Sequence, residues 1–88
     1  EAIDDLSKVI ELNPMHSRAW FNRGRSRIEL GDFANAVTDL TRAAEYDPKA
    51  AEIYRARARA YRGLKQIKLA QEDELKAKRL EGKLFNTL

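Results

Sequence analysis

The sequence predicts an all-α protein built from antiparallel helix pairs, because the chain matches itself when it is shifted by 34 residues. Residues 2–6 overlie residues 36–40, Pro14 overlies Pro48, and Trp20 overlies Tyr54. Apolar residues recur at helical spacing within each copy, and no segment alternates apolar and polar residues as a strand would. A period of this length with two helical segments per copy is typical of repeat proteins whose units stack side by side.

The first helix is expected over residues 1–12. Its apolar residues share one face of a helix of period 3.6: Ile3, Leu6, Val9 and Ile10. Asn13-Pro14 should end this helix, because the residue before a proline is disfavoured in the α region. The pattern starts in the middle of a copy, so residues 1–16 are interpreted as the second helix of a truncated repeat, with an apolar face that lacks part of its cover.

A complete copy is expected over residues 17–50. Ser17 is predicted to cap a helix that carries Trp20, and Gly31 followed by Asp32 predicts a tight turn into a second helix. Asp47-Pro48 should end that second helix. Its apolar residues again follow helical spacing: Phe33, Ala36, Val37, Leu40, Ala43 and Ala44. Small residues at Gly24 and Ala58 should let paired helices approach closely, with Trp20 and Tyr54 in the core beside them.

The last copy is expected over residues 51–82, within a single domain of residues 1–88. Its second helix is more polar than that of the middle copy, since Gln71, Glu74 and Lys78 stand where Val37, Leu40 and Ala44 stood. A polar outer helix is what a terminal repeat needs for solubility, so residues 68–82 are expected to end the array. The tail, residues 83–88, leaves two alternatives for its apolar residues: they extend the last helix and fold back, or they fray (Leu84, Phe85 and Leu88, with Leu80 before them).

The period and its residue types resemble the tetratricopeptide repeat, a helix–turn–helix unit. The residues that carry the resemblance are Trp20, Gly24, Gly31, Phe33, Ala36, Leu40, Ala43 and Pro48. Arg23 and Arg27 depart from it, because the family usually has leucine and tyrosine there. The resemblance implies a right-handed superhelical α-solenoid of about five helices, and a protein–protein interaction scaffold that is not an enzyme.

In such solenoids the first helices of successive repeats line a concave groove, which is where a partner segment is expected to bind. The resemblance places these residues in the groove: Arg18, Phe21, Asn22, Arg25, Ile28 and Glu29 from the middle repeat, and Glu52, Arg55, Ala56, Arg59, Arg62 and Gly63 from the last. Five arginines against two glutamates predict a basic groove, suited to the carboxylates of an acidic protein segment. Phe21 is expected to be an exposed aromatic anchor.

Chaperone-binding members of this family hold a carboxylate with asparagine and basic side chains, and Asn22 stands at a matching position. The last repeat has Glu52 and Ala56 where basic residues would be needed. Glu52 would repel a carboxylate, so this type of site is disfavoured.

The charge distribution leaves an alternative open. Residues 1–50 carry seven Lys/Arg against nine Asp/Glu, whereas residues 51–88 carry ten against five. The basic C-terminal half could bind an anionic polymer such as RNA, although stacking aromatics beyond Phe21 are missing, which makes nucleic acid the weaker expectation. Self-association through the apolar face of residues 1–12 is a third reading.

Catalytic, metal and cofactor sites are not expected. The chain has no cysteine, and its one histidine, His16, falls in a connection where it should be a solvated loop residue. Asp4-Asp5 and Glu72-Asp73-Glu74 are interpreted as surface charge on exposed helix faces. No apolar run is long enough to span a membrane, and no signal peptide is recognisable; the compartment stays open, with the cytoplasm favoured.

Overall fold

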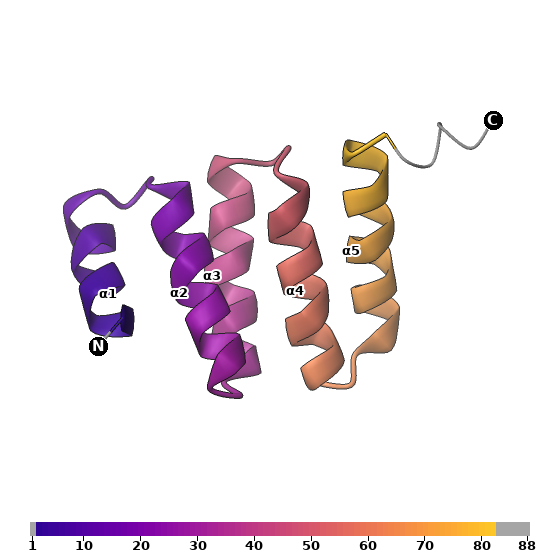
Figure 1. Ribbon diagram of the computed structural model, residues 1–88, viewed down its shortest axis with the longest axis horizontal. Helices are drawn as coiled ribbons and strands as arrows, with labels where there is room; N and C mark the ends of the chain where they lie inside the picture. The colour runs from indigo at the N-terminus through magenta and orange to yellow at the C-terminus, as the bar shows by residue number, and fades with distance from the viewer. Residues whose placement is uncertain (1, 83–88) are drawn as a thin grey trace.

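The computed structural model describes residues 2–82, which form five α-helices in a row (Figure 1). Their bounds are α1 Ala2–Leu12, α2 Ser17–Glu29, α3 Phe33–Tyr46, α4 Ala51–Gly63 and α5 Ile67–Leu80. The described residues include no strand, so the predicted all-α class is confirmed. The expectations for the tail, residues 83–88, lie outside the described part of the chain.

The helices form antiparallel pairs that stack along the long axis of the molecule. The α2–α3 and α4–α5 pairs have the most extensive contacts, and α3 packs in turn against α4, while α1 packs against α2 (Figure 1). The predicted turn between α2 and α3 is confirmed, because Gly31 has a φ of 79°, in the left-handed region that favours glycine. Both asparagine- and aspartate-proline pairs end a helix as expected, since α1 stops at Leu12 and α3 at Tyr46.

Close approach of α2 and α3 depends on Gly24. A Cβ atom added there would lie 2.8 Å from the Cγ atom of Leu40, which is closer than carbon atoms pack. Leu40 is fully buried, as are Ala36 and Ala43 on the same face of α3. The expectation that a small residue stands at this helix crossing is therefore confirmed.

The start of α2 differs from the prediction. His16, not Ser17, is the N-cap residue, and its Nδ1 atom accepts a hydrogen bond from the backbone N–H of Ala19 at 3.2 Å. Ser17 begins the helix proper, and its hydroxyl donates to the backbone oxygen of Ala43 at 2.9 Å. The serine is thus used to join α2 to the end of α3, which leaves the cap to its neighbour. His16 is exposed but has a structural role.

Each first helix is also tied to the connection that precedes it by an aromatic side chain. Trp20 Nε1 donates to the backbone oxygen of Pro14 at 2.7 Å, and the Tyr54 hydroxyl donates to that of Pro48 at 2.8 Å. Tyr54 is buried in the core as predicted. Trp20, which was also expected in the core, is only partly buried and packs against the core cluster. The two contacts are 34 residues apart, so the repeat extends to individual hydrogen bonds.

Three helices are joined at a second repeated contact, which we call an arginine bridge. In the first bridge, Arg23 on α2 donates to both carboxylate oxygens of Asp39 on α3, at 2.9 and 2.8 Å, and to the hydroxyl of Ser7 on α1 at 3.0 Å. Arg27 adds a bond to Asp39 at 3.0 Å. Asp39 is completely buried. None of the buried polar side-chain atoms in this bridge lacks a hydrogen-bond partner.

The second bridge repeats the first 34 residues later. Arg57 on α4 donates to both carboxylate oxygens of Asp73 on α5 at 2.8 Å, and to the hydroxyl of Thr41 on α3 at 3.2 Å. Asp73 is only 5% exposed, so its assignment to the surface was wrong. The two hydrogen bonds that Arg57 donates to Asp73 raise the pKa of Arg57, and those that Arg23 donates to Asp39 raise the pKa of Arg23, although burial of each guanidinium acts in the opposite direction.

Candidate interaction surface

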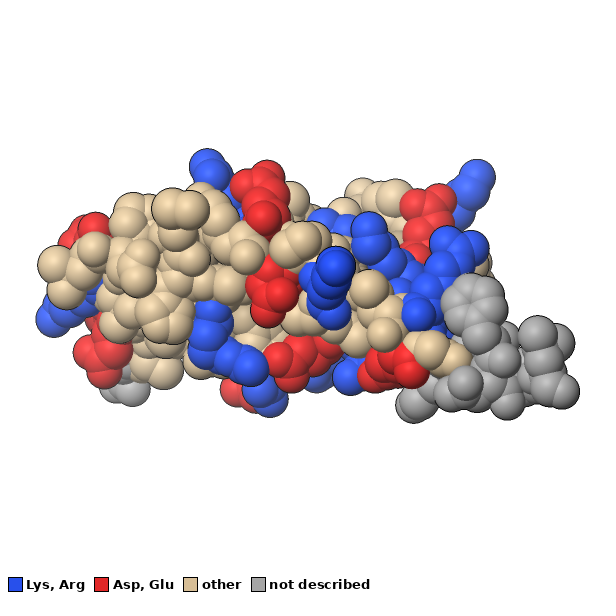
Figure 2. Space-filling view, turned by 90° about the horizontal axis from the view of Figure 1, so that it is seen from above, with Lys and Arg blue, Asp and Glu red and all other residues tan. Residues whose placement is uncertain are grey.

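Six of the residues predicted for the groove come together where α2 and α4 lie side by side. A groove of about 300 Å³ is lined by Phe21, Arg25, Glu52, Arg55, Ala56 and Arg59, and we call it the arginine groove. Its basic side chains come from one turn of α2 and two turns of α4, because positions 55 and 59 are four residues apart on one helix face. Seen from above, basic and acidic side chains are intermixed over the half of the molecule that carries α4 and α5 (Figure 2).

Phe21 is not the exposed aromatic anchor that the sequence predicts. It is 4% exposed and belongs to the core, together with Ile53 and Ala56 of α4. The guanidinium groups of Arg18 and Arg25 lie over its ring, 5.1 and 5.6 Å from the centroid. Helix α4 of the next repeat covers Phe21. The residue pattern of α2 alone does not reveal that α4 packs there.

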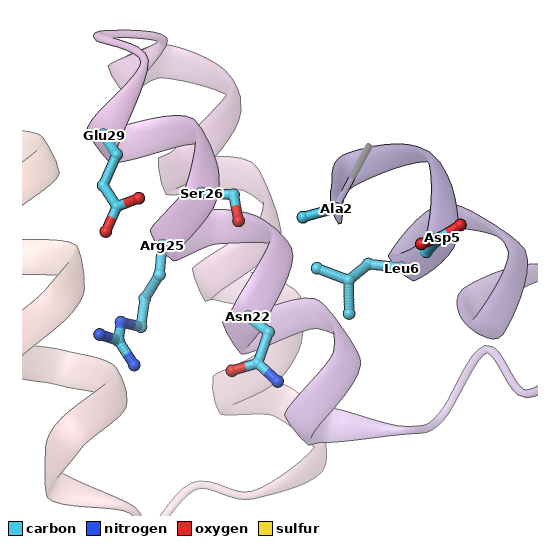
Figure 3. A pocket seen from close by; sticks show the side chains of 7 residues that line it. All are labelled: Ala2, Asp5, Leu6, Asn22, Arg25, Ser26 and Glu29. Atoms are coloured by element: carbon cyan, nitrogen blue, oxygen red, sulfur yellow. The ribbon is translucent and has the colours of Figure 1, made fainter.

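The other predicted groove residues do not line the arginine groove. Arg62 pairs with Glu74 of α5, through two hydrogen bonds of 2.8 Å. Asn22 lines a separate hollow between α1 and α2, which it shares with Arg25 but also with the acidic Asp5 and Glu29 (Figure 3), so this hollow does not have the basic lining that a carboxylate-binding site of the chaperone type needs. Ile28 is buried in the core, as is Ala56 at the floor of the arginine groove.

Some arginines in and beside the arginine groove form ion pairs, and others do not. Arg18 holds Glu52 in an ion pair of 2.9 Å, and Arg55 is paired with Glu81. Arg25 and Arg59 are both exposed and make no ion pair with any residue that the structure describes. These two arginines occupy equivalent positions in adjacent repeats, so their guanidinium groups are the cationic donors that a ligand in the groove would meet.

Other kinds of site find little support within residues 2–82. No group of three histidine, cysteine, aspartate or glutamate side chains is placed to hold a metal ion. In the same range no helix is both long and apolar enough to cross a membrane.

The two arginine bridges could have been recognised from the sequence. Arg23, Asp39 and the hydroxyl of Ser7 recur 34 residues later as Arg57, Asp73 and the hydroxyl of Thr41. The recurrence of an acid–base pair at the repeat period would have indicated that Arg23 is a structural residue and that Asp73 is buried.

Comparison with known proteins agrees with the repeat. Residues 17–50 match the family model of the tetratricopeptide repeat. No curated protein matches the chain.

Solved structures of MamA share the fold. MamA AMB-1 in the P212121 crystal form is 28% identical with a TM-score of 0.84, and the match covers 88% of this chain and 46% of that chain. MamA MSR-1 in the C2 form is also 28% identical, with a TM-score of 0.84 and coverage of 89% and 45%. A further crystal structure of MamA has a TM-score of 0.88 at 24% identity, covering 96% and 49%, which shows the fold alone. The chain spans slightly less than half the length of these structures.

Proposed function

Because this chain is a solenoid of tetratricopeptide repeats, a fold that serves as a protein-interaction scaffold, we propose that its arginine groove binds an acidic segment of a partner protein. The observation that carries the proposal is the pair Arg25 and Arg59, which are exposed, adjacent across α2 and α4, and without an ion pair among the described residues. Guanidinium groups bind carboxylates through two parallel hydrogen bonds, so two aligned arginines favour two acidic groups on one ligand.

The arrangement of the groove residues restricts the kind of ligand that fits. Arg25 and Arg59 line one hollow of about 300 Å³, floored by the buried ring of Phe21 and by Ala56. Glu52 at its edge is paired with Arg18, so that end of the groove offers no unpaired cation to an acidic group. An extended segment with two carboxylates toward the Arg59 side fits these charges.

RNA binding has less support than protein binding. Stacking on exposed aromatic side chains contributes much of the affinity for single-stranded nucleic acid. Phe21, the aromatic residue that could have stacked a base, is covered by α4 and by two arginines. Without stacking groups, a basic surface can bind RNA only through its phosphate groups, and such binding weakens steeply as the salt concentration rises.

Selection of peptides from a displayed random library tests the proposal. Peptides selected on the wild-type chain are expected to be rich in Asp and Glu, and to lose most of their affinity for Arg25→Glu/Arg59→Glu. The matched control is Lys49→Glu/Lys68→Glu, which makes the same charge change at exposed positions outside the groove. Equal losses in both variants would mean that only net charge matters, and acidic peptides that ignore the groove variant would contradict the proposal.

The RNA reading is tested on the same two variants with a fluorescent single-stranded RNA of mixed sequence, titrated at low and at physiological salt. Tight binding at physiological salt that the groove variant abolishes would replace the protein proposal.

A further inference from the structure

The arginine groove continues, at the end where α2 and α4 begin, into a smaller hollow of opposite charge. This hollow has a volume of about 50 Å³ and shares Phe21 and Glu52 with the groove, so the two form one surface along α2 and α4. Its other lining residues are Ser17 and Arg18 of α2, Ile53 of α4, and Asp47, which lies between α3 and α4. We call it the aspartate hollow.

Asp47 supplies the unpaired charge of the aspartate hollow. It is exposed and makes no ion pair with any residue that the structure describes, whereas Glu52 is held by Arg18 at 2.9 Å. Asp47 also stands at the C-terminal end of α3, where the helix dipole favours a cation. The hydroxyl of Ser17 donates to the backbone oxygen of Ala43, so its own oxygen can still accept a hydrogen bond. A cation in the hollow would therefore meet one unpaired carboxylate and one hydroxyl acceptor.

The size of the aspartate hollow favours an ammonium group. A water molecule takes up about 30 Å³ in the liquid, so a group as compact as the ammonium of lysine fits into a volume of about 50 Å³. The planar guanidinium of arginine carries three nitrogen atoms and needs more room. The side chain that suits this hollow is therefore lysine.

The unpaired cations of the arginine groove lie at its other end. Arg25 follows Arg18 by seven residues on α2, and Arg59 follows Glu52 by seven on α4, which places the two ends of the groove about 10 Å apart. Arg25 points away from α1, toward α4 (Figure 3). An extended peptide advances about 3.3 Å per residue, so a ligand passes from one end of the groove to the other in about three residues.

We propose that the partner segment carries a lysine about three residues from its pair of acidic residues, with the ammonium group in the aspartate hollow and the carboxylates on Arg25 and Arg59. The proposal rests on the function proposed for the arginine groove, and it adds the order of charges in the ligand. Such a segment pairs the unpaired charges at both ends, whereas a uniformly acidic segment would bring its own carboxylates toward Asp47. The groove thus selects by the arrangement of charges and not by net charge alone.

Fluorescence anisotropy with four labelled peptides tests the proposal. The first peptide has the sequence Lys-Ala-Ala-Glu-Glu, is acetylated at its N-terminus and carries the dye on a C-terminal glycine spacer. In the other three, the lysine is replaced by glutamine, the lysine is replaced by arginine, or both glutamates are replaced by glutamine. The wild-type chain should bind the lysine peptide about threefold more tightly than the glutamine peptide, as expected for an exposed ion pair. The arginine peptide should gain less.

A variant of the chain completes a double-mutant cycle. Asp47→Asn should abolish the preference for lysine over glutamine and should still bind the glutamine peptide. Asparagine is compatible with this position, because Asn13 precedes a proline in the same way 34 residues earlier. The matched control, Glu11→Gln, removes the same charge from an exposed position of α1 outside the groove and the hollow, and it should keep the preference.

The outcomes separate a failure of this proposal from a failure of the proposed function. If wild type binds the lysine and glutamine peptides equally, or if the lysine preference survives Asp47→Asn, the order of charges is overturned while acidic binding stands. An arginine peptide that binds as tightly as the lysine peptide would overturn the assignment of lysine. A peptide without glutamates that binds as tightly as the lysine peptide, or no binding of any peptide, would contradict the acidic ligand of the arginine groove and this proposal with it.

Discussion

The middle repeat, residues 17–50, and the last repeat, residues 51–82, keep the same contacts inside the repeat and differ in the surface that they offer to a following repeat. Both hold an aspartate of the second helix with an arginine of the first, and both anchor an aromatic residue to a proline carbonyl. The core of the middle repeat contains Phe21, Ile28 and Leu40. The equivalent residues of the last repeat are charged: Arg55, Arg62 and Glu74.

The difference shows that packing within a repeat and packing between repeats are specified by separate residues. Ile28 and Leu40 are buried in the core, whereas Arg62 and Glu74 form an exposed ion pair at the same two positions. An ion pair of this kind contributes little to stability, but it keeps the end of the stack hydrated. The last repeat therefore ends the described solenoid without changing its own internal geometry.

The largest expected effect is loss of a bridge aspartate. Asp39→Asn should lower the free energy of unfolding by about 3 kcal/mol, because Arg23 and Arg27 both lose their carboxylate in a partly buried site. Asp73→Asn should cost less, about 2 kcal/mol, since one arginine depends on it. Urea denaturation of the two variants measures the difference, and a loss for Asp73→Asn that equals or exceeds that for Asp39→Asn would show that the second arginine, Arg27, adds nothing to the first bridge.

Overpacking of the helix crossing comes next. Gly24→Leu should destabilise the chain by about 1–3 kcal/mol, because even a Cβ atom at this position meets Leu40 at 2.8 Å. The equivalent position of the last repeat already holds alanine, and Ala58→Gly should cost about 1 kcal/mol through helix propensity. Thermal unfolding followed by circular dichroism compares both changes. A Gly24→Leu variant as stable as wild type would mean that the helices separate at no cost.

A smaller effect on stability, but a change of assembly, is expected when the last repeat receives the residues of the middle one. Arg62→Ile/Glu74→Leu should change the free energy of unfolding little, because only a surface ion pair is removed. The variant should self-associate, since it exposes a new apolar patch at the end of the stack. Sedimentation velocity over a range of concentrations is the measurement, with Arg62→Gln/Glu74→Gln as the matched polar control; a monomeric Ile/Leu variant would contradict the assigned role.

The smallest effect is a pH dependence of the same pair. The hydrogen bond from Arg62 is the main reason why the pKa of Glu74 lies below its ordinary value of 4.5. The contribution of Glu74 to stability is therefore complete above that value, and it is lost as the pH falls through the lower pKa of the folded state. Glu74→Gln should lose less stability than wild type between neutral and acidic pH, in urea titrations at low salt. Because the pair is exposed, the difference should shrink in high salt, and an unchanged difference would point to another carboxylate.

Much of the fold was predictable because it depends on local spacing. Gly31, Pro14 and Pro48 set the helix ends, and apolar periodicity identified the faces that pack. Which side of α2 meets the next repeat is a property of the stack, so the burial of Phe21 could not be deduced from its own helix. The bridges do not follow from apolar spacing or from the family pattern, from which Arg23 departs; only the recurrence of Arg23 and Asp39 as Arg57 and Asp73 at the repeat period indicates them.

Part of the predicted set of groove residues lies together in the structure, whereas partner binding by that set stays a prediction. Arg25, Arg55 and Arg59 do meet in one groove, because equivalent positions of neighbouring repeats align when the repeats stack. Arg62 does not, since the acidic side chain that pairs with it belongs to α5, and helix spacing alone does not show where a second helix places its charges.

The hydroxyl group in each arginine bridge determines where a further repeat could be added to this solenoid. Every bridge takes its arginine and aspartate from one repeat and its hydroxyl from the repeat before, at Ser7 for the first and Thr41 for the second. A duplicated copy of residues 17–50, inserted after residue 50, would bring all three groups in register and could bond to either neighbour without further change. Growth beyond α5 would meet Leu75 in place of the hydroxyl. A repeat inserted after residue 50 would thus find the hydroxyl that its bridge needs, whereas a repeat stacked on α5 would not.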